Sequence, residues 1–210
     1  MSTVVRIDIS PSSHPDLIQG TSPGAVVGRG ALESMYTAFG KINDTAEKVR
    51  DKPRLAAAVQ PFAERAISHA GRAIDTLTAQ VKSLSKQITE KITPGVEPSM
   101  GVSIRDYWAQ HDGPKALMGI KAAIDANDIT TVSALFRAPA YLSGLTEKNY
   151  TVLRDVAAQH FAGEQVIHLA EARAALGNVE TALSDFTEKV GAHLASWKDD
   201  DARILEKELK

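Results

Sequence analysis

Residues 31–49, ALESMYTAFGKINDTAEKV, contain the pattern that decides the fold. Their apolar side chains recur at steps of three and four residues, which places them on one face of an α-helix. The repeat is close to seven residues, as in helices that pair along a seam. The members of this seam are Leu32, Met35, Phe39, Ile42, Ala46 and Val49. We therefore expect a helix here that buries one face against other helices.

A second, longer helix is expected after Pro53, which ends the first helix because it disfavours helical backbone in the residue before it. Pro61 fits the first position of the second helix, where its missing N–H costs nothing. Residues 93–95 (Thr-Pro-Gly) stop that helix. The two helices predict an antiparallel hairpin over residues 31–93, followed by a linker over residues 94–102.

Residues 103–197 show the patterns of shorter helices. Asp128 and Thr146 are suitable N-capping residues, and the Gly-Asn pair at 177–178 is a stop signal. Residues 198–210 form a charged tail, since nine of these thirteen residues are Asp, Glu, Lys or Arg. The sequence thus predicts an all-α fold, with a long antiparallel helical hairpin and a smaller helical bundle.

Residues 1–30 form an extended N-terminal arm without a helical pattern. They are rich in proline, glycine, serine and threonine, and such segments bury too little apolar surface to offset their ordering entropy. Val5, Ile7 and Ile9 alternate with polar residues, which favours either a short strand or extended coil. A lone strand needs another chain to pair with. We expect a neighbouring subunit to hold the arm.

The composition excludes several classes of protein. Hydrophobic residues make up 43% of the chain and charged residues 24%, as in soluble globular proteins. No run approaches the roughly 20 apolar residues of a membrane helix, and the absence of cysteine excludes thiolate metal sites. The net charge of -2 argues against nucleic-acid binding through bulk charge. We expect no membrane and no specific nucleic-acid partner.

Charge is unevenly distributed. Residues 41–91 carry more basic than acidic side chains, and residues 93–210 carry the reverse. Two interpretations stay open: ordinary surface scatter, or basic and acidic halves that face each other within one subunit or between neighbours.

His160, Glu164 and His168 line one stripe of a helix at i, i+4 and i+8, and side chains of these types ligate zinc or iron. Residues eight apart lie about 12 Å apart along a helix axis. All three side chains therefore cannot reach one ion, and we interpret the stripe as facing solvent or an interface. The run Asp199 to Asp201 lacks the glycine turn and distal glutamate of a calcium loop. We expect no metal and no cofactor.

Catalytic motifs are likewise not found. Residues 28–30 (Gly-Arg-Gly) lack the third glycine of a dinucleotide fingerprint, and no GK[ST] phosphate loop occurs. No GxSxG elbow presents a serine nucleophile. The chain is therefore predicted not to be an enzyme.

Several apolar and aromatic residues are candidates for subunit contacts. Tyr107, Trp108 and Trp197 lie at helical positions, where such residues are core or interface anchors. Tyr141 lies in an apolar connection between two helices, residues 138–145. The interface candidates are Val5, Ile7, Ile9, Tyr107, Trp108, Tyr141 and Trp197.

The run LFRAPAYLSGLT at residues 135–146 resembles segments of small helical structural proteins of tailed bacteriophages. The resemblance implies a virion component with no catalytic residues, without indicating head, neck or tail connector. We therefore expect a non-enzymatic structural subunit of a multimeric assembly, with itself and other structural proteins as partners. The alternative is a helical adaptor or regulator of the bacterial cytoplasm that binds a partner through its hairpin. A helical enzyme or metal protein built around His160, Glu164 and His168 is the third class.

Overall fold

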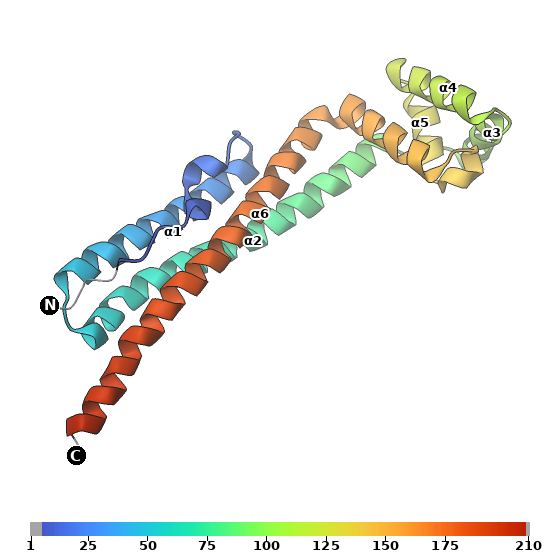
Figure 1. Cartoon of the computed structure of the whole chain (residues 1–210). Helices are drawn as coiled ribbons and strands as arrows, with labels where there is room; N and C mark the ends of the chain where they lie inside the picture. Colours follow the sequence, from blue (N-terminus) through green and yellow to red (C-terminus); the bar gives the residue numbers. More distant parts are fainter. Residues whose placement is uncertain (1–5, 209–210) are drawn as a thin grey trace. The chain divides into compact units, whose positions relative to one another are not determined.

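Every regular element in the described part of the chain is a helix. The computed structural model describes the backbone of residues 6–208 and the side chains of residues 6–198. The prediction of an all-α fold is confirmed. In chain order the elements are η1 (Pro11–Ser13), η2 (Pro15–Leu17), α1 (Pro23–Lys48), α2 (Lys52–Ile92), α3 (Pro98–Ala109), α4 (Gly113–Asp125), α5 (Ile129–Phe136), η3 (Ala140–Ser143) and α6 (Glu147–Glu208) (Figure 1).

The helices form two compact units. Unit 1 comprises residues 1–81 and 170–210, and unit 2 comprises residues 82–169. The boundaries fall inside α2 and α6, so each of these helices contributes to both units. The sequence pattern instead favours divisions at loops, with a linker over residues 94–102. The predicted linker is also too long, because α3 already begins at Pro98. The two divisions differ because loops mark only where helices end, whereas a core depends on which helix faces pack together.

Unit 1 is a bundle of α1, the first part of α2 and the second part of α6. α1 and α2 are antiparallel, since only residues 49–51 separate them, and α6 runs beside both (Figure 1). The rings of Phe39 and Phe186 meet edge to face with their centroids 4.7 Å apart. Ala66 and Ala70 of α2 are buried, and such small side chains let helices approach closely. The predicted seam is confirmed as a buried face, with Val49 only partly buried.

The two hairpin helices begin earlier than predicted. α1 starts at Pro23, after Ser22 accepts a hydrogen bond from a first-turn N–H. α2 starts at Lys52 and contains Pro61 in its interior, so the prediction that Pro61 opens this helix is wrong. An internal proline removes one helical hydrogen bond and costs about 3 kcal/mol. Buried neighbours such as Val59 hold the helix together across it.

α6 does not stop at the Gly-Asn pair of residues 177–178, contrary to prediction. Ala175 and Val179 on either side are fully buried in the core of unit 1. Their burial outweighs the roughly 1 kcal/mol that glycine costs inside a helix. Ala162 has non-helical backbone angles (φ −139°, ψ 32°), so α6 is two helices joined at a kink.

The described part of the arm packs on its own chain, which corrects the expectation that it needs a neighbouring subunit. Residues 6–10 are extended coil, one of the two alternatives, and two short 3-10 turns follow. Ile7 and Ile18 are 2% and 4% exposed and belong to the core of unit 1. Burying one such side chain contributes about 1.5–3 kcal/mol. A few apolar residues in a mostly polar segment therefore suffice to anchor it.

Unit 2 packs α3, α4, α5 and η3 with the end of α2 and the beginning of α6. Its core contains Ile92, Ile120, Leu135 and Leu153. Asp128 caps α5 by accepting from the Thr131 N–H, at 3.1 Å, as predicted. The predicted cap at Thr146 is also confirmed, with its hydroxyl 3.2 Å from the Asn149 nitrogen. Short capped helices thus surround a separate core.

Candidate interaction surfaces

Three of the predicted interface residues serve packing within the chain. Ile7 and Trp197 are 2% and 4% exposed in the core of unit 1. Trp108 packs against unit 2's core, and its ring covers Gly119 of α4. A Cβ at Gly119 would lie 2.3 Å from two atoms of that ring, so only glycine fits there without movement. Val5 lies outside the described residues.

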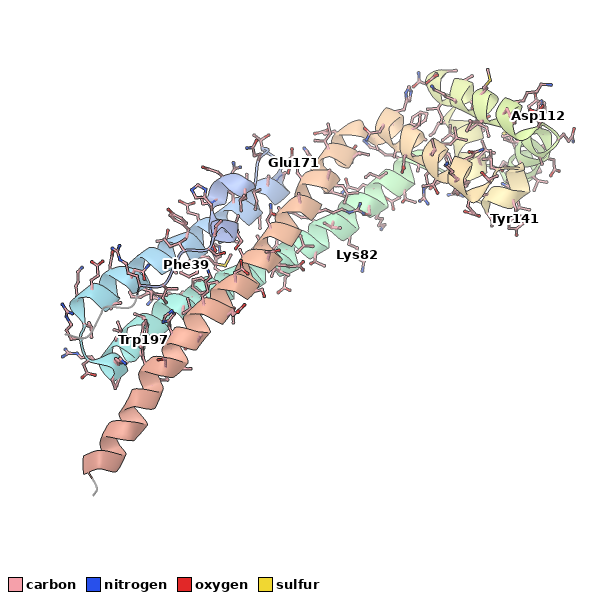
Figure 2. All side chains as sticks on the ribbon, in the orientation of Figure 1. Phe39, Lys82, Asp112, Tyr141, Glu171 and Trp197 are labelled. Atoms are coloured by element: carbon pink, nitrogen blue, oxygen red, sulfur yellow. The ribbon has the colours of Figure 1, made fainter. Side chains whose placement is uncertain are left out.

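Ile9, Tyr107 and Tyr141 are exposed, as a contact surface requires. Tyr107 is 53% and Tyr141 72% exposed, and Tyr141 can be followed in Figure 2. The ends of α3 and η3 touch at Gly144, where a Cβ would lie 3.2 Å from the Ala109 Cα. Gly144 has a φ of +68°, which favours glycine. The two tyrosines therefore lie on neighbouring elements of unit 2.

Exposed apolar side chains are concentrated in unit 2. Among residues 6–198, eight of the thirteen exposed large apolar side chains belong to this unit. Five of the eight lie on the contacting elements α3 and η3, and we call them the α3–η3 edge: Met100, Val102, Tyr107, Tyr141 and Leu142. Groups of exposed apolar side chains are typical of surfaces that bind other proteins.

In unit 1, the arm lies in a groove between α1 and α6, and side chains of both helices bind its backbone. The Asn43 side chain of α1 accepts a hydrogen bond from the Ile7 N–H at 2.8 Å and donates one to the Ile7 carbonyl at 2.9 Å. Lys189 and Asn178 of α6 donate to the carbonyls of Asp8 and Leu17, at 3.2 and 3.4 Å. Side chains from both helices thus bind an extended peptide.

Carboxylates on α6 hold the arm's polar groups. The hydroxyls of Ser10 and Ser12 donate to the same oxygen of Asp185, at 2.8 and 2.6 Å. These two bonds, of which the one from Ser12 has the larger effect, hold the pKa of the Asp185 carboxyl below its ordinary value. Glu171 accepts from the Ser22 N–H at 3.1 Å. A Cβ on Gly20 would lie only 2.4 Å from the carboxyl carbon of Glu171, so the arm backbone passes close to this side chain.

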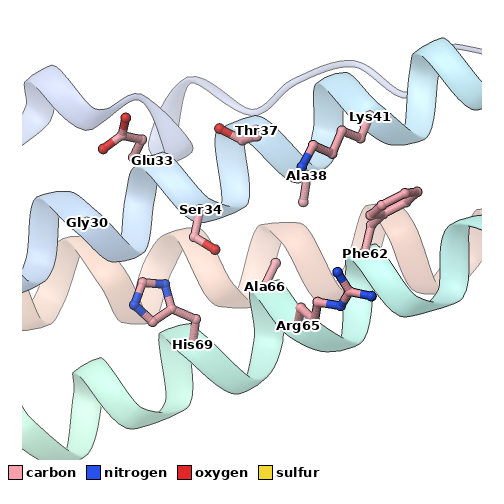
Figure 3. A pocket seen from close by; sticks show the side chains of 10 residues that line it. All are labelled: Gly30, Glu33, Ser34, Thr37, Ala38, Lys41, Phe62, Arg65, Ala66 and His69. Carbon is pink, nitrogen blue, oxygen red and sulfur yellow. The ribbon is translucent and has the colours of Figure 1, made fainter.

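A second groove of unit 1 lies between α1 and α2. It is open to solvent and has a volume of about 390 Å³. Small residues (Gly30, Ala38 and Ala66) line it beside the half-buried Phe62. Its polar lining, drawn in Figure 3, comprises Glu33, Ser34, Thr37, Lys41, Arg65 and His69.

The cations of this α1–α2 groove gather at one end. The Lys41 ammonium lies 5.7 Å from the centroid of the Phe62 ring, and Figure 3 shows Arg65 beside the same ring. Ser34 and His69 lie toward the other end, on opposite helices. Within the described side chains, neither Lys41 nor Arg65 forms an ion pair. Both charges are therefore free to meet a ligand.

The groove between α2 and α6 differs in charge. Ile74 and Leu183 supply its apolar surface, and Glu180 and Glu188 its charge. It contains no basic lining residue. Of these two grooves, the α1–α2 groove therefore has the lining better suited to anions.

The stripe of His160, Glu164 and His168 is interrupted by the kink at Ala162. His160 Nε2 lies 2.8 Å from the side-chain oxygen of Asn127, which has a φ of +59°. The histidine thus braces a left-handed turn between α4 and α5. Among the described residues, no group of three His, Asp or Glu side chains is arranged to hold a metal ion.

The residues that line the α1–α2 groove were not predicted from the sequence, although their spacing contains a signal. Arg65 and His69 are spaced i, i+4 on α2, and Thr37 and Lys41 have the same spacing on α1. Each pair is therefore predictable as a polar stripe. That the two stripes face each other follows only from the register between the helices.

Comparisons with protein-family models, curated proteins and solved structures find no match for this chain. In the described part of the chain, no helix combines the length and the hydropathy needed to cross a membrane.

Proposed function

We propose that this protein is a non-enzymatic structural subunit of a multimeric assembly, in which the α3–η3 edge of unit 2 contacts another copy. The observation that carries the proposal is the exposure of Tyr107 and Tyr141 on neighbouring elements. Tyrosine suits a contact surface because it combines a large apolar ring with a hydroxyl. Repetition of one contact around a ring then adds avidity.

We further propose that the arm stabilises its own subunit and is not the first point of contact between subunits. Its described residues occupy a groove of the same chain, so subunit contact through them requires their release first. Contact through unit 2 needs no such step. We therefore assign the first contact between copies to unit 2 and regard the arm as a stabilising element of unit 1.

The native mass tests this proposal. The purified chain, of 22.5 kDa, is expected to elute as a multiple of that mass in light scattering. Tyr107→Ser with Tyr141→Ser should reduce the complex to monomers with unchanged helical circular dichroism, because both side chains are exposed. Val26→Ser is the matched control, since Val26 is 56% exposed on α1 in unit 1. A monomeric wild-type chain at micromolar concentration would contradict self-assembly.

The proposal extends to a component of a tailed-phage particle. Residues 138–145, within the run that resembles phage structural proteins, contain Tyr141 and Leu142 of the α3–η3 edge. The resemblance and the contact surface thus share one segment. Mass spectrometry of purified particles is expected to find the chain at a fixed stoichiometry to the other structural proteins. Recovery of the chain only from the cytoplasmic fraction would refute this extension.

A second candidate is a helical adaptor of the bacterial cytoplasm, and the open α1–α2 groove favours it. The two candidates differ in a measurable way. An adaptor stays monomeric and binds one defined partner through the hairpin, whereas an assembly subunit forms a complex with itself.

A further inference from the structure

Unit 1 shows how its grooves accept a peptide, because the arm fills one of them. Asn43, Lys189 and Asn178 bind the arm's backbone. Isoleucine side chains, Ile7 and Ile18, fill the apolar floor. Proteins that recognise extended peptides use the same two components, namely hydrogen bonds to the peptide backbone and pockets for its side chains.

The α1–α2 groove has the same components but no segment of the described chain in it. Ala38 and Ala66 are buried beneath it, and Phe62 presents a half-exposed ring. The hydroxyls of Ser34 and Thr37 are available to bond a peptide backbone. The groove accordingly has room for an apolar side chain and partners for main-chain groups.

Charge distinguishes the two grooves. The arm's groove presents the carboxylates of Asp185 and Glu171 to hydroxyls and N–H groups. The α1–α2 groove presents Lys41 and Arg65 around Phe62, and Arg72 lies on the adjoining surface of α2. One glutamate, Glu33, lines the groove together with these cations. Glu64 lies on the adjoining surface of α2, where it accepts a hydrogen bond from Gln60 at 2.6 Å.

We propose that the α1–α2 groove binds an extended acidic peptide segment of a partner protein. Its carboxylates pair with Lys41 and Arg65, and an apolar side chain packs on Phe62 above Ala66. Arg65 can bind a carboxylate with two parallel hydrogen bonds, which fixes the peptide's position. This site is in unit 1 and does not depend on contact between copies through unit 2.

A labelled peptide tests the site directly. The probe is a short glutamate-rich peptide with one leucine, and its partner probe replaces every glutamate with lysine. Fluorescence anisotropy should show saturable binding of the acidic probe that weakens as salt is raised, because exposed charges are screened. The basic probe should not bind.

Charge reversal then locates the site. Lys41→Glu with Arg65→Glu is expected to weaken binding of the acidic probe by about tenfold or more, since two attractions become repulsions. Arg173→Glu with Lys121→Glu makes the same change in net charge at exposed positions outside the groove, and should change binding by less than about twofold. Circular dichroism checks that both variants are folded.

Photocrosslinking provides a second readout on the wild-type chain. A photoreactive group in place of the probe's leucine should label α1 or α2 near Phe62. Labelling elsewhere, no saturable binding, or equal weakening in the two charge-reversed variants would overturn the proposal. The Tyr107→Ser, Tyr141→Ser variant separates this test from self-assembly, because it should still bind the probe as a monomer.

Discussion

In unit 1 the rings of Phe39, Phe186 and Trp197 are buried, whereas in unit 2 Tyr107 and Tyr141 are exposed. Unit 1 consists of long helices with continuous apolar seams, and the chain's own arm covers one of its grooves. Unit 2 uses helices of 8 to 13 residues for α3, α4 and α5. Exposure thus depends on what covers a helix as well as on its composition.

The largest effect is expected from a charge in the core of unit 1. Phe39→Asp removes the ring contact with Phe186 and buries a carboxylate, which should cost more than about 4 kcal/mol. Each unit contains one tryptophan, Trp197 in unit 1 and Trp108 in unit 2. Urea unfolding of single-tryptophan variants will therefore report on each unit separately.

We expect the Phe39→Asp chain to lose the Trp197 transition while the Trp108 signal persists. Thr37→Asp, an exposed position on α1, is the control and should change stability by less than about 0.5 kcal/mol. Loss of both signals together would show that the two units unfold as one.

A smaller effect is expected from Gly119→Ala in unit 2. The new Cβ would overlap the Trp108 ring, and such overpacking costs about 1–3 kcal/mol. The Trp108 emission should shift to longer wavelength as the ring moves toward solvent. Gly71→Ala is the matched control because nothing lies within 4 Å of its added Cβ, so it should stabilise α2 by about 0.5–1 kcal/mol. Unchanged Trp108 emission in the Gly119 variant would contradict the packing described.

Loss of the Asn43 side chain is expected to weaken the attachment of the arm by about 1–3 kcal/mol. Asn43→Ala removes both hydrogen bonds to the Ile7 backbone, each contributing about 0.5–1.5 kcal/mol. Hydrogen exchange at residues 6–18 should accelerate by about tenfold in this variant, and exchange in unit 2 should not change. Asp44→Ala, at an exposed neighbouring position, should leave the arm protected. An unchanged arm in the Asn43 variant would mean that its side chains alone hold it.

The smallest effect concerns pH. The pKa of Asp185 is depressed in the folded chain. The ionised carboxylate therefore stabilises the fold above the unfolded pKa, and this stabilisation is lost as pH falls through the folded pKa. The urea midpoint of wild type should exceed that of Asp185→Asn near neutral pH. The difference should shrink as pH falls below the ordinary value of 3.8 and vanish below the folded pKa. A difference that persists at lower pH would show that Ser10 and Ser12 do not bind the charged form.

Local sequence patterns predicted a substantial part of this fold. The heptad spacing from Leu32 to Ala46 identified the buried face of α1, and Asp128 and Thr146 were recognised as caps. Both signals depend on residues within a few positions of one another. Of the interface candidates, Tyr107 and Tyr141 are exposed, whereas Trp197 is buried, since aromatic residues at helical positions occur in cores and at interfaces alike.

The sequence alone determined that the chain is helical, because helical periodicity and capping are local properties. Only the tertiary structure decided that α6 continues through residues 177–178, where buried neighbours outweigh a glycine's cost. It also decided that the arm packs on its own chain, since Asn43 and Asp185, which bind the arm, lie far from it in sequence. The α1–α2 groove likewise exists only because the register of two helices brings Lys41 and Arg65 around one ring. Interactions between distant residues depend on packing, which no local pattern encodes.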